Sequence, residues 1–228
     1  MTMKRSSRAR LNARSLARFT TDSLFDRVAR VVCEASCLPR KELFESWEVA
    51  RRVRRHFRGG RVVDLAGGHG LLAHLCLVLD DSSPVAVVVD RRVPASAPTL
   101  SLALTTAWPR LAGRVSFVED DVSSVTLGPD DLVVSVHACG SLTDVVLRRA
   151  ALGRARVAVL PCCHDLREND LGGLAGWVDG PLAIDLTRAS YLRSEGYSVR
   201  TQVLPPGITD KSRLLMGTPH ELTPRGEP

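Results

Sequence analysis

Hydrophobic residues change their spacing near residue 60, and this change divides the chain into two parts. Between residues 22 and 57, apolar side chains recur three and four positions apart, as on one face of a helix. This spacing predicts one helix that begins after Asp22, a residue suited to cap it, and a second helix over residues 40–57. Gly59-Gly60 then ends the helical pattern.

Beyond Gly60, short apolar runs alternate with helical stretches. The runs predict strands over residues 61–65, 85–89, 114–118, 132–136, 155–160, 197–203 and 212–216. The stretches between them predict helices near residues 70–80, 97–110, 141–152 and 183–195. This alternation favours a mostly parallel sheet with helices on both faces. The sequence therefore predicts an α/β domain over residues 60–220, preceded by N-terminal helices over residues 20–59.

The net charge of +6 arises at the N-terminus. Residues 1–19 contain no acid and six basic residues, namely Lys4, Arg5, Arg8, Arg10, Arg14 and Arg18. We predict a disordered basic tail over residues 1–19 that contacts the phosphates of RNA, helped by the arginine-rich helix over residues 51–58. A solvated tail without a partner and a mitochondrial targeting segment are the alternatives. Residues 221–228 are predicted to form a flexible tail.

The remaining composition concerns membranes and thiols. No apolar run reaches the roughly 18 residues that a membrane span needs, so we expect no membrane partner. Six cysteines occur without the spacing of a small disulfide framework, which favours reduced thiols and a cytoplasmic location.

A glycine-rich segment, Gly67-Gly68-His69-Gly70, lies between the first predicted strand and the next helix. Glycines let the backbone approach a ligand closely, and the helix N-terminus offers free N–H groups. Asp90 ends the second strand, where a carboxylate can accept hydrogen bonds from both ribose hydroxyls of an adenosine. Asp120 and Asp121 follow the third strand and can hold the adenine amino group. These positions predict a cofactor that contains adenosine.

Asp64, Ala66, Gly67, Gly68 and Gly70 together resemble the pattern Asp-x-Gly-x-Gly-x-Gly of class I S-adenosylmethionine-dependent methyltransferases, with Ala66 at the first glycine position. The resemblance implies a Rossmann-like, seven-stranded methyltransferase sheet whose last strand inserts antiparallel. It also implies S-adenosylmethionine as cofactor, with Asp64 near the methionine moiety.

A second cofactor class also fits the loop. The run from Gly68 to Ala73 satisfies the dinucleotide pattern Gly-x-Gly-x-x-Gly/Ala, and Asp90 lies 22 residues after Gly68. An NAD(P)-binding oxidoreductase is therefore an alternative. The acid at the end of the strand and the four-residue step before Gly68 favour the methyltransferase.

Reactive side chains follow the fourth and fifth strands. These side chains are His137, Cys139, Asp144, Cys162, Cys163 and His164. The carboxyl ends of parallel strands line the ligand crevice of such a sheet, so we expect these residues to lie near one another. His137, Asp144 and His164 are candidate bases for a hydroxyl acceptor, and Cys162 is a candidate nucleophile toward a pyrimidine ring. His137 is also expected to line the cofactor pocket. Adjacent cysteines are not a usual chelating spacing, so we expect no metal.

The motifs His-x-Cys-Gly-x-x-Thr-Asp, from His137, and Pro-Cys-Cys-His, from Pro161, resemble a paired-cysteine subfamily of methyltransferases. That subfamily includes the tRNA 2′-O-methyltransferase that acts on the acceptor stem. The resemblance implies an RNA substrate and methylation of a ribose 2′-hydroxyl. The zinc module that precedes the domain in the tRNA enzyme has no counterpart here, and aromatic residues for base stacking make up only 4% of the chain. A methyltransferase for a small molecule or a protein is therefore the alternative.

Overall fold

Seven strands form a single sheet in the computed structural model, which describes residues 4–210 and 212–221. The strands are β1 (Val62–Leu65), β2 (Ala86–Asp90), β3 (Val115–Glu119), β4 (Leu132–Ser135), β5 (Arg156–Val159), β6 (Tyr197–Val203) and β7 (Arg213–Pro219). Their order across the sheet is β3-β2-β1-β4-β5-β7-β6. Strands β1 to β5 pair in parallel, whereas β7 lies between β5 and β6 and is antiparallel to both. The predicted mostly parallel sheet with an antiparallel last strand is confirmed.

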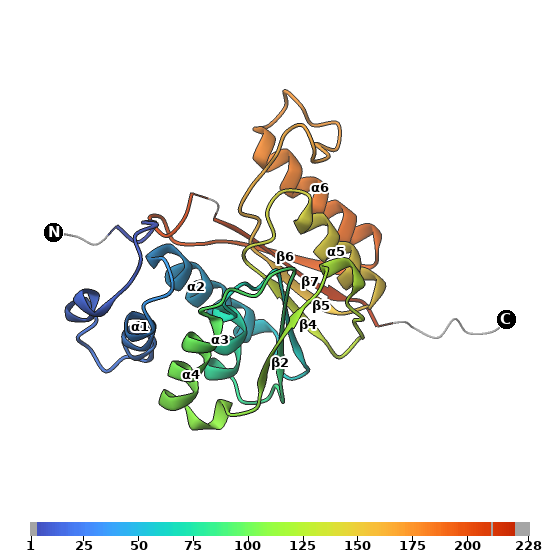
Figure 1. Ribbon diagram of the computed structural model, residues 1–228. Coiled ribbons are helices and arrows are strands. Elements are labelled where there is room, and N and C mark those ends of the chain that lie inside the picture. The colour runs from blue at the N-terminus through green and yellow to red at the C-terminus, as the bar shows by residue number, and fades with distance from the viewer. Residues whose placement is uncertain (1–3, 211, 222–228) are drawn as a thin grey trace.

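Helices cover both faces of this sheet. They are α1 (Leu24–Ala35), α2 (Arg40–His56), α3 (Leu71–Leu79), α4 (Ala97–Ala107), α5 (Leu142–Leu152) and α6 (Gly180–Ser194), with short 3₁₀ turns η1 (Ala13–Arg18), η2 (Pro109–Leu111) and η3 (Val122–Ser124). Figure 1 shows α1 to α4 on one side of the sheet, and α5 and α6 on the other. None of the described helices is long and apolar enough to cross a membrane.

Two buried clusters fill the spaces between the sheet and its helices. Because side chains alternate along a strand, Val62 enters the cluster beneath α1 to α4, whereas Val63 enters the cluster beneath α5 and α6. The same alternation places Asp64 on the side of Val62, facing α3. The period of the strand thus brings a carboxyl group to the point where β1 meets the following helix.

The N-terminal segment folds against the helices, contrary to the prediction of a disordered tail over residues 1–19. Leu11 is fully buried and Phe19 is 3% exposed. The Leu11 N–H donates to the Leu38 carbonyl at 2.9 Å, and the Arg40 N–H donates to the Ala9 carbonyl at 2.9 Å. Two apolar side chains and these backbone bonds hold residues 4–19 in place despite their charge. Residues 1–3 and most of the predicted C-terminal tail, 222–228, lie outside the described residues.

Candidate active site

The loop between β1 and α3 takes a left-handed course. Ala66, Gly68 and Gly70 have φ angles of +56°, +51° and +71°. Glycine adopts this region without strain, whereas alanine pays a steric penalty of roughly 1–2 kcal/mol. Ala66 therefore adopts the left-handed conformation expected of the glycine that it replaces in the pattern, and it does so with backbone strain.

Two of these glycines permit the loop to lie close to its neighbours. A Cβ at Gly67 would approach Asp64 Cγ and Val88 Cγ1 to 2.7 Å, and one at Gly70 would approach Val88 Cγ2 to 2.8 Å. By contrast, a Cβ at Gly68 would meet no heavy atom of the described residues within 4 Å. The loop is thus pressed against β2 on one side and faces open space at Gly68, where a ligand can approach the backbone.

Asp64 is buried at the base of this loop. Its side chain Oδ2 accepts a hydrogen bond from the Ala73 N–H at 3.2 Å. Its Oδ1 has no hydrogen-bond partner within residues 4–210 and 212–221. Burial raises the pKa of Asp64 to about 7 against the opposing effect of the Ala73 N–H, and the charge of Asp90 raises it further. A buried oxygen without a partner is costly, and the amino group of a methionine moiety would supply the missing partner.

Asp90 connects the ends of two strands with the loop. Its Oδ2 accepts from the Gly68 N–H at 3.0 Å and its Oδ1 accepts from the Arg92 N–H at 3.2 Å. A carboxylate has further lone pairs for the hydroxyls of a ribose. The Asp120 N–H donates to the Asp90 carbonyl at 3.0 Å, which places Asp120 beside Asp90 at the same edge of the sheet.

Asp121 is engaged in local contacts. Its carboxylate accepts from the Ser123 N–H at 2.8 Å, which caps η3, and it pairs with Arg91 at 2.5 Å. The hydrogen bonds from Ser123 and Arg91 lower the pKa of Asp121 to about 2. Of the two predicted adenine contacts, Asp120 is the one whose side chain carries fewer such bonds: its Oδ1 accepts from the Asp121 N–H at 2.7 Å.

His137 follows β4, which pairs with β1 in the sheet, and it lines a cavity. Burial and the positive charge of Lys41 lower its pKa to about 4, and the charges of Asp90 and His69 also act on it. Asp90 and His69 belong to the loops described above. The cavity that His137 lines has a volume of about 680 Å³. The lining of this cavity also includes Lys4, Arg8, Lys41, Glu42, Glu45, Cys139, Cys162, Cys163 and His164.

His164 is held at the wall of this cavity by Asp185 of α6. The His164 Nε2 lies 2.7 Å from Asp185 Oδ1, and the Arg213 Nε donates to Asp185 Oδ2 at 2.7 Å. Burial raises the pKa of Asp185, but the bonds from His164 and Arg213 outweigh it and lower the pKa overall, so the group is a carboxylate near neutral pH. Within the described residues, His164 Nδ1 is buried and has no hydrogen-bond partner. With Nε2–H donated to a carboxylate, Nδ1 keeps its lone pair and can accept a proton.

Asp144 lies apart from this cavity. Its Oδ1 pairs with the Arg188 Nε at 2.6 Å, and its Oδ2 accepts from the Asn169 amide at 2.9 Å. Arg188 is buried, and its Nη2 also donates to the Gly140 carbonyl at 2.8 Å. Asp144 is therefore not among the residues that line this cavity. Its contact with Arg188 fixes the loop after β4 to α6 and links Asp144 to Asp185, the partner of His164.

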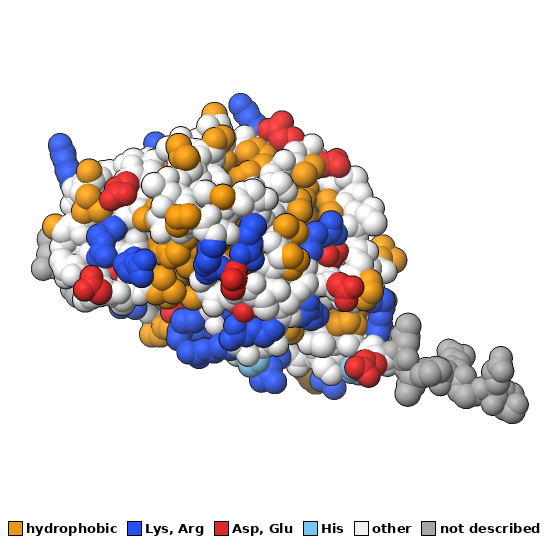
Figure 2. Space-filling view, turned by 90° about the horizontal axis from the view of Figure 1, so that it is seen from below, with side chains coloured by type: hydrophobic (Ala, Val, Ile, Leu, Met, Phe, Trp, Pro, Cys, Tyr) orange, Lys and Arg blue, Asp and Glu red, His pale blue; other side chains and the backbone are white. Residues whose placement is uncertain are grey.

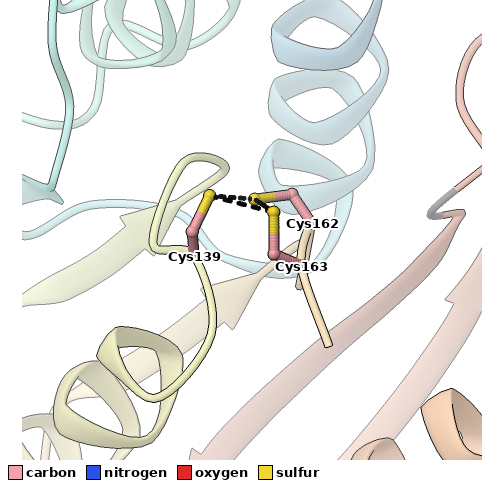
Figure 3. A group of neighbouring side chains, drawn as sticks. All are labelled: Cys139, Cys162 and Cys163. Atoms are coloured by element: carbon pink, nitrogen blue, oxygen red, sulfur yellow. Dashed lines mark hydrogen bonds between the residues drawn. The ribbon is translucent and has the colours of Figure 1, made fainter. Parts of the chain in front are cut away.

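Three thiols converge at the same cavity (Figure 3). Cys139 lies in the loop after β4, and Cys162 and Cys163 lie in the loop after β5. Cys139 Sγ is 2.8 Å from Cys162 Sγ and 3.3 Å from Cys163 Sγ. The contact with Cys162 lowers the pKa of Cys139 to about 6, and the same contact raises that of Cys162. The predicted proximity of the two strand ends is thus seen in the structure.

Several charges of the predicted basic surface are paired with acids. Figure 2 shows Lys and Arg side chains gathered along one edge of the face seen from below, next to acidic and hydrophobic side chains. On α2, however, Arg54 is buried and pairs with Asp80, and Arg51 and Arg52 both pair with Glu48. These acids neutralise much of the positive charge of the arginine-rich helix that the sequence analysis expected to contact RNA.

Sequence reasoning did not assign a role to Asp185, Arg188 or Arg213. Asp185 and Arg188 are three positions apart on α6 and so share a face of that helix, and Arg188 Nη1 lies 3.5 Å from Asp185 Oδ1. That spacing could have predicted an ion pair between Asp185 and Arg188. The contact of Asp185 with His164, 21 residues away along the chain, follows only from the fold.

Comparison with known proteins gives the family. The profile of a family described as a methyltransferase domain matches residues 42–169, which is 128 of the 228 residues. No curated protein matches the sequence. An O-methyltransferase family protein from Burkholderia thailandensis superposes with a TM-score of 0.53 at 18% identity, covering 95% of this chain and 66% of that protein. The m1A22 tRNA methyltransferase of B. subtilis superposes with a TM-score of 0.51 at 14% identity, covering 76% of this chain and 66% of that protein. These likenesses concern the fold, and the chain spans just under two thirds of the length of each of the two proteins.

Proposed function

The chain belongs to the methyltransferase-domain family, and from this premise we propose that it transfers the methyl group of S-adenosylmethionine to a hydroxyl group of RNA. Membership of this family leaves the nicotinamide-dependent alternative without a basis. The Gly68 opening, the unpartnered Asp64 oxygen and the Asp90 carboxylate fit the backbone, methionine and ribose contacts that this cofactor requires.

The position of His137 is the observation that carries the proposal. This one side chain follows β4, the strand that pairs with β1 ahead of the glycine-rich loop, and it also lines the cavity that contains His164. S-adenosylmethionine, when bound, supplies a methyl group on a positively charged sulfur, which a nucleophile displaces in line. A cofactor site and an acceptor cavity that meet at one residue provide the proximity on which this displacement depends.

We assign proton acceptance to His164. The acceptor hydroxyl would give up its proton to His164 Nδ1 as it attacks, and Asp185 would stabilise the resulting imidazolium through Nε2–H. The His164 side chain is 1% exposed, so the loop after β5 must open for an acceptor hydroxyl to reach Nδ1, which would then gain the hydrogen-bond partner that it lacks within the described residues. Neutral His137 faces the acceptor without charge, because burial and Lys41 hold its pKa near 4.

RNA is the acceptor that the N-terminal segment favours. This segment is basic and free of acids, and its folding brings Lys4 and Arg8 to the lining of the cavity, where Lys41 of α2 joins them. Basic side chains at the mouth of an acceptor cavity attract and orient a phosphate backbone. A ribose 2′-hydroxyl, in line with the paired-cysteine motifs, is the proposed methylated group.

Transfer of labelled methyl from S-adenosylmethionine to cellular RNA, protein and metabolite fractions tests the proposal. We expect label in RNA, and nuclease digestion followed by mass spectrometry to locate it on a ribose. Label in the metabolite or protein fraction alone would overturn the RNA assignment and support the alternative acceptor class.

Variants divide the roles. His164→Gln is expected to lower kcat by at least about 100-fold with little change in KM, because general base catalysis contributes roughly 10²–10⁴-fold. The double variant Lys4→Ala/Arg8→Ala is expected to raise KM for RNA and flatten its salt dependence. Arg14→Ala/Arg18→Ala removes the same number of charges and is the matched control, because neither arginine is among the residues that line this cavity. Equal effects of both charge changes would contradict the proposed path of the RNA.

A further inference from the structure

The three thiols at the acceptor cavity are a feature that methyl transfer to oxygen does not use. Cys139 comes from the loop after β4, and Cys162 and Cys163 come from the loop after β5. Their sulfur atoms all lie within 4.8 Å of one another. The loops are joined by a hydrogen bond from the Gly140 N–H to the Cys163 carbonyl at 3.1 Å, so the convergence is supported by the backbone.

The cluster differs from ordinary packing of cysteines in the core. Cys33, Cys37 and Cys76 are buried among apolar side chains, where a thiol serves as a small hydrophobic group. Cys139 and Cys163 are instead exposed at the cavity, and Cys162 is half-buried between them. Filling space in the core does not explain thiols gathered at an open surface.

We propose that Cys139, Cys162 and Cys163 bind one Zn²⁺ ion through their three sulfur atoms. Zinc prefers thiolate ligands at about 2.3 Å in tetrahedral geometry, which sets the ligand sulfurs roughly 3.8 Å apart. The Cys162–Cys163 separation of 3.7 Å already matches this value, and Cys139 at 2.8 and 3.3 Å needs only to move outward in its exposed loop.

Adjacent cysteines alone argued against a metal, because neighbouring residues in a chain seldom chelate one ion together. The structure adds a third thiol, Cys139 in the loop after β4, to the pair in the loop after β5. The metal ligands therefore come from two loops that converge in the fold. The charges of Lys41 and Glu45 both act on Cys139, and the larger effect is that of Lys41, whose positive charge balances part of the negative charge of three thiolates.

The site leaves one position of the tetrahedron for a ligand from the cavity. Three protein ligands with an open fourth position are typical of zinc sites that bind water or substrate, whereas structural zinc sites use four protein ligands. The inference therefore places a Lewis-acidic ion at the wall of the acceptor cavity, beside His164. It does not rest on the methyl-transfer proposal, because metal binding is measured without cofactor or acceptor.

Titration of the reduced, full-length protein with Co²⁺ and Zn²⁺ tests the inference. We expect one Co²⁺ per chain with sulfur-to-metal charge-transfer absorption, and its displacement by one Zn²⁺ in competition with a chromophoric chelator. Cys139→Ser, Cys162→Ser and Cys163→Ser are each expected to weaken binding by more than the roughly 10–100-fold that outer contacts of a metal site contribute. Cys37→Ala, which removes a buried thiol away from the cavity, is the control and is expected to bind as the wild type does.

Circular dichroism of each variant verifies that it is folded, and the exposed positions of Cys139 and Cys163 make this the expected result. Absence of charge-transfer absorption in the folded wild type would overturn the inference. So would binding that Cys139→Ser leaves unchanged, or a Cys139–Cys162 disulfide found by mass spectrometry in metal-free protein as isolated.

Discussion

Replacement of Asp64 by asparagine is expected to stabilise the ligand-free protein at alkaline pH and to remove cofactor binding. Burial raises the pKa of Asp64 from 3.8 to about 7 in the folded protein. The folded state therefore holds a proton that the unfolded chain releases between these values, so the group favours folding less as pH rises through this window. Asparagine has nearly the same shape and does not titrate, and its oxygen can still accept from the Ala73 N–H.

The magnitude follows from the shift. Three pKa units correspond to about 4 kcal/mol of free energy, at roughly 1.4 kcal/mol per unit. We expect the stability of Asp64→Asn relative to the wild type to increase by about 4 kcal/mol between pH 4 and pH 8. The buried amide N–H₂ lacks a protein partner and costs about 1–3 kcal/mol at every pH, so the net gain at pH 8 is smaller.

Urea unfolding of both proteins at a series of pH values measures this difference, with Asp130→Asn as an exposed control. A pH-independent difference would refute the burial argument. Calorimetry with S-adenosylhomocysteine gives the second half of the result. If the Asp64→Asn variant bound as tightly as the wild type, the role of the Asp64 carboxylate in holding the methionine moiety would be refuted.

Three further changes follow from the packing. Ala66→Gly relieves the left-handed strain and is expected to stabilise the protein by about 1 kcal/mol in urea unfolding. The helical control Ala73→Gly is expected to destabilise it by about 2 kcal/mol, because it loses helix propensity and a buried methyl group. A loss of stability at both positions would contradict the strain. Leu11→Ala is expected to lower the free energy of unfolding by about 2–5 kcal/mol, because Leu11 is fully buried. A decrease below about 0.5 kcal/mol would contradict the packing of residues 4–19 against the helices. Burial lowers the pKa of His74 from 6.5 to about 4, so its contribution is complete above pH 6.5 and is lost as pH falls through 4. The wild type should therefore lose roughly 3 kcal/mol more than His74→Asn between pH 7 and pH 4, and parallel curves would contradict it.

The fold was predictable because the strands are short and bounded by clear breaks, and the central strands β1, β2, β4 and β5 are rich in apolar residues. All seven strands lie where the predicted runs place them, within about two residues of the predicted ends for most of them. The prediction of disorder at residues 4–19 was wrong because it considered the charge of this segment and not its two buried apolar side chains, Leu11 and Phe19. Leu11 and Phe19 are too far apart in sequence to form a periodic pattern, and the surface that buries them is made by α1 and α2.

The site was predictable where its residues stand at strand ends. Parallel strands bring their carboxyl ends to one edge, so His137, Cys139, Cys162 and His164 were expected together and line one cavity. Asp144 has the same sequence signal, but its position in the first turn of α5 aims it at Arg188 instead. The packing of α5 against α6 decides that Asp144 pairs with Arg188 and that Asp185 contacts His164. No local sequence pattern contains that information.

Calorimetric titration of the full chain with S-adenosylhomocysteine, beside NAD, tests the central claim most directly. We predict one S-adenosylhomocysteine site per chain, no binding of NAD, and a loss of more than about 1 kcal/mol of binding free energy in Asp90→Ala, since charge-assisted bonds to the ribose are removed. Absence of S-adenosylhomocysteine binding to folded protein, or binding of NAD in its place, would contradict the account.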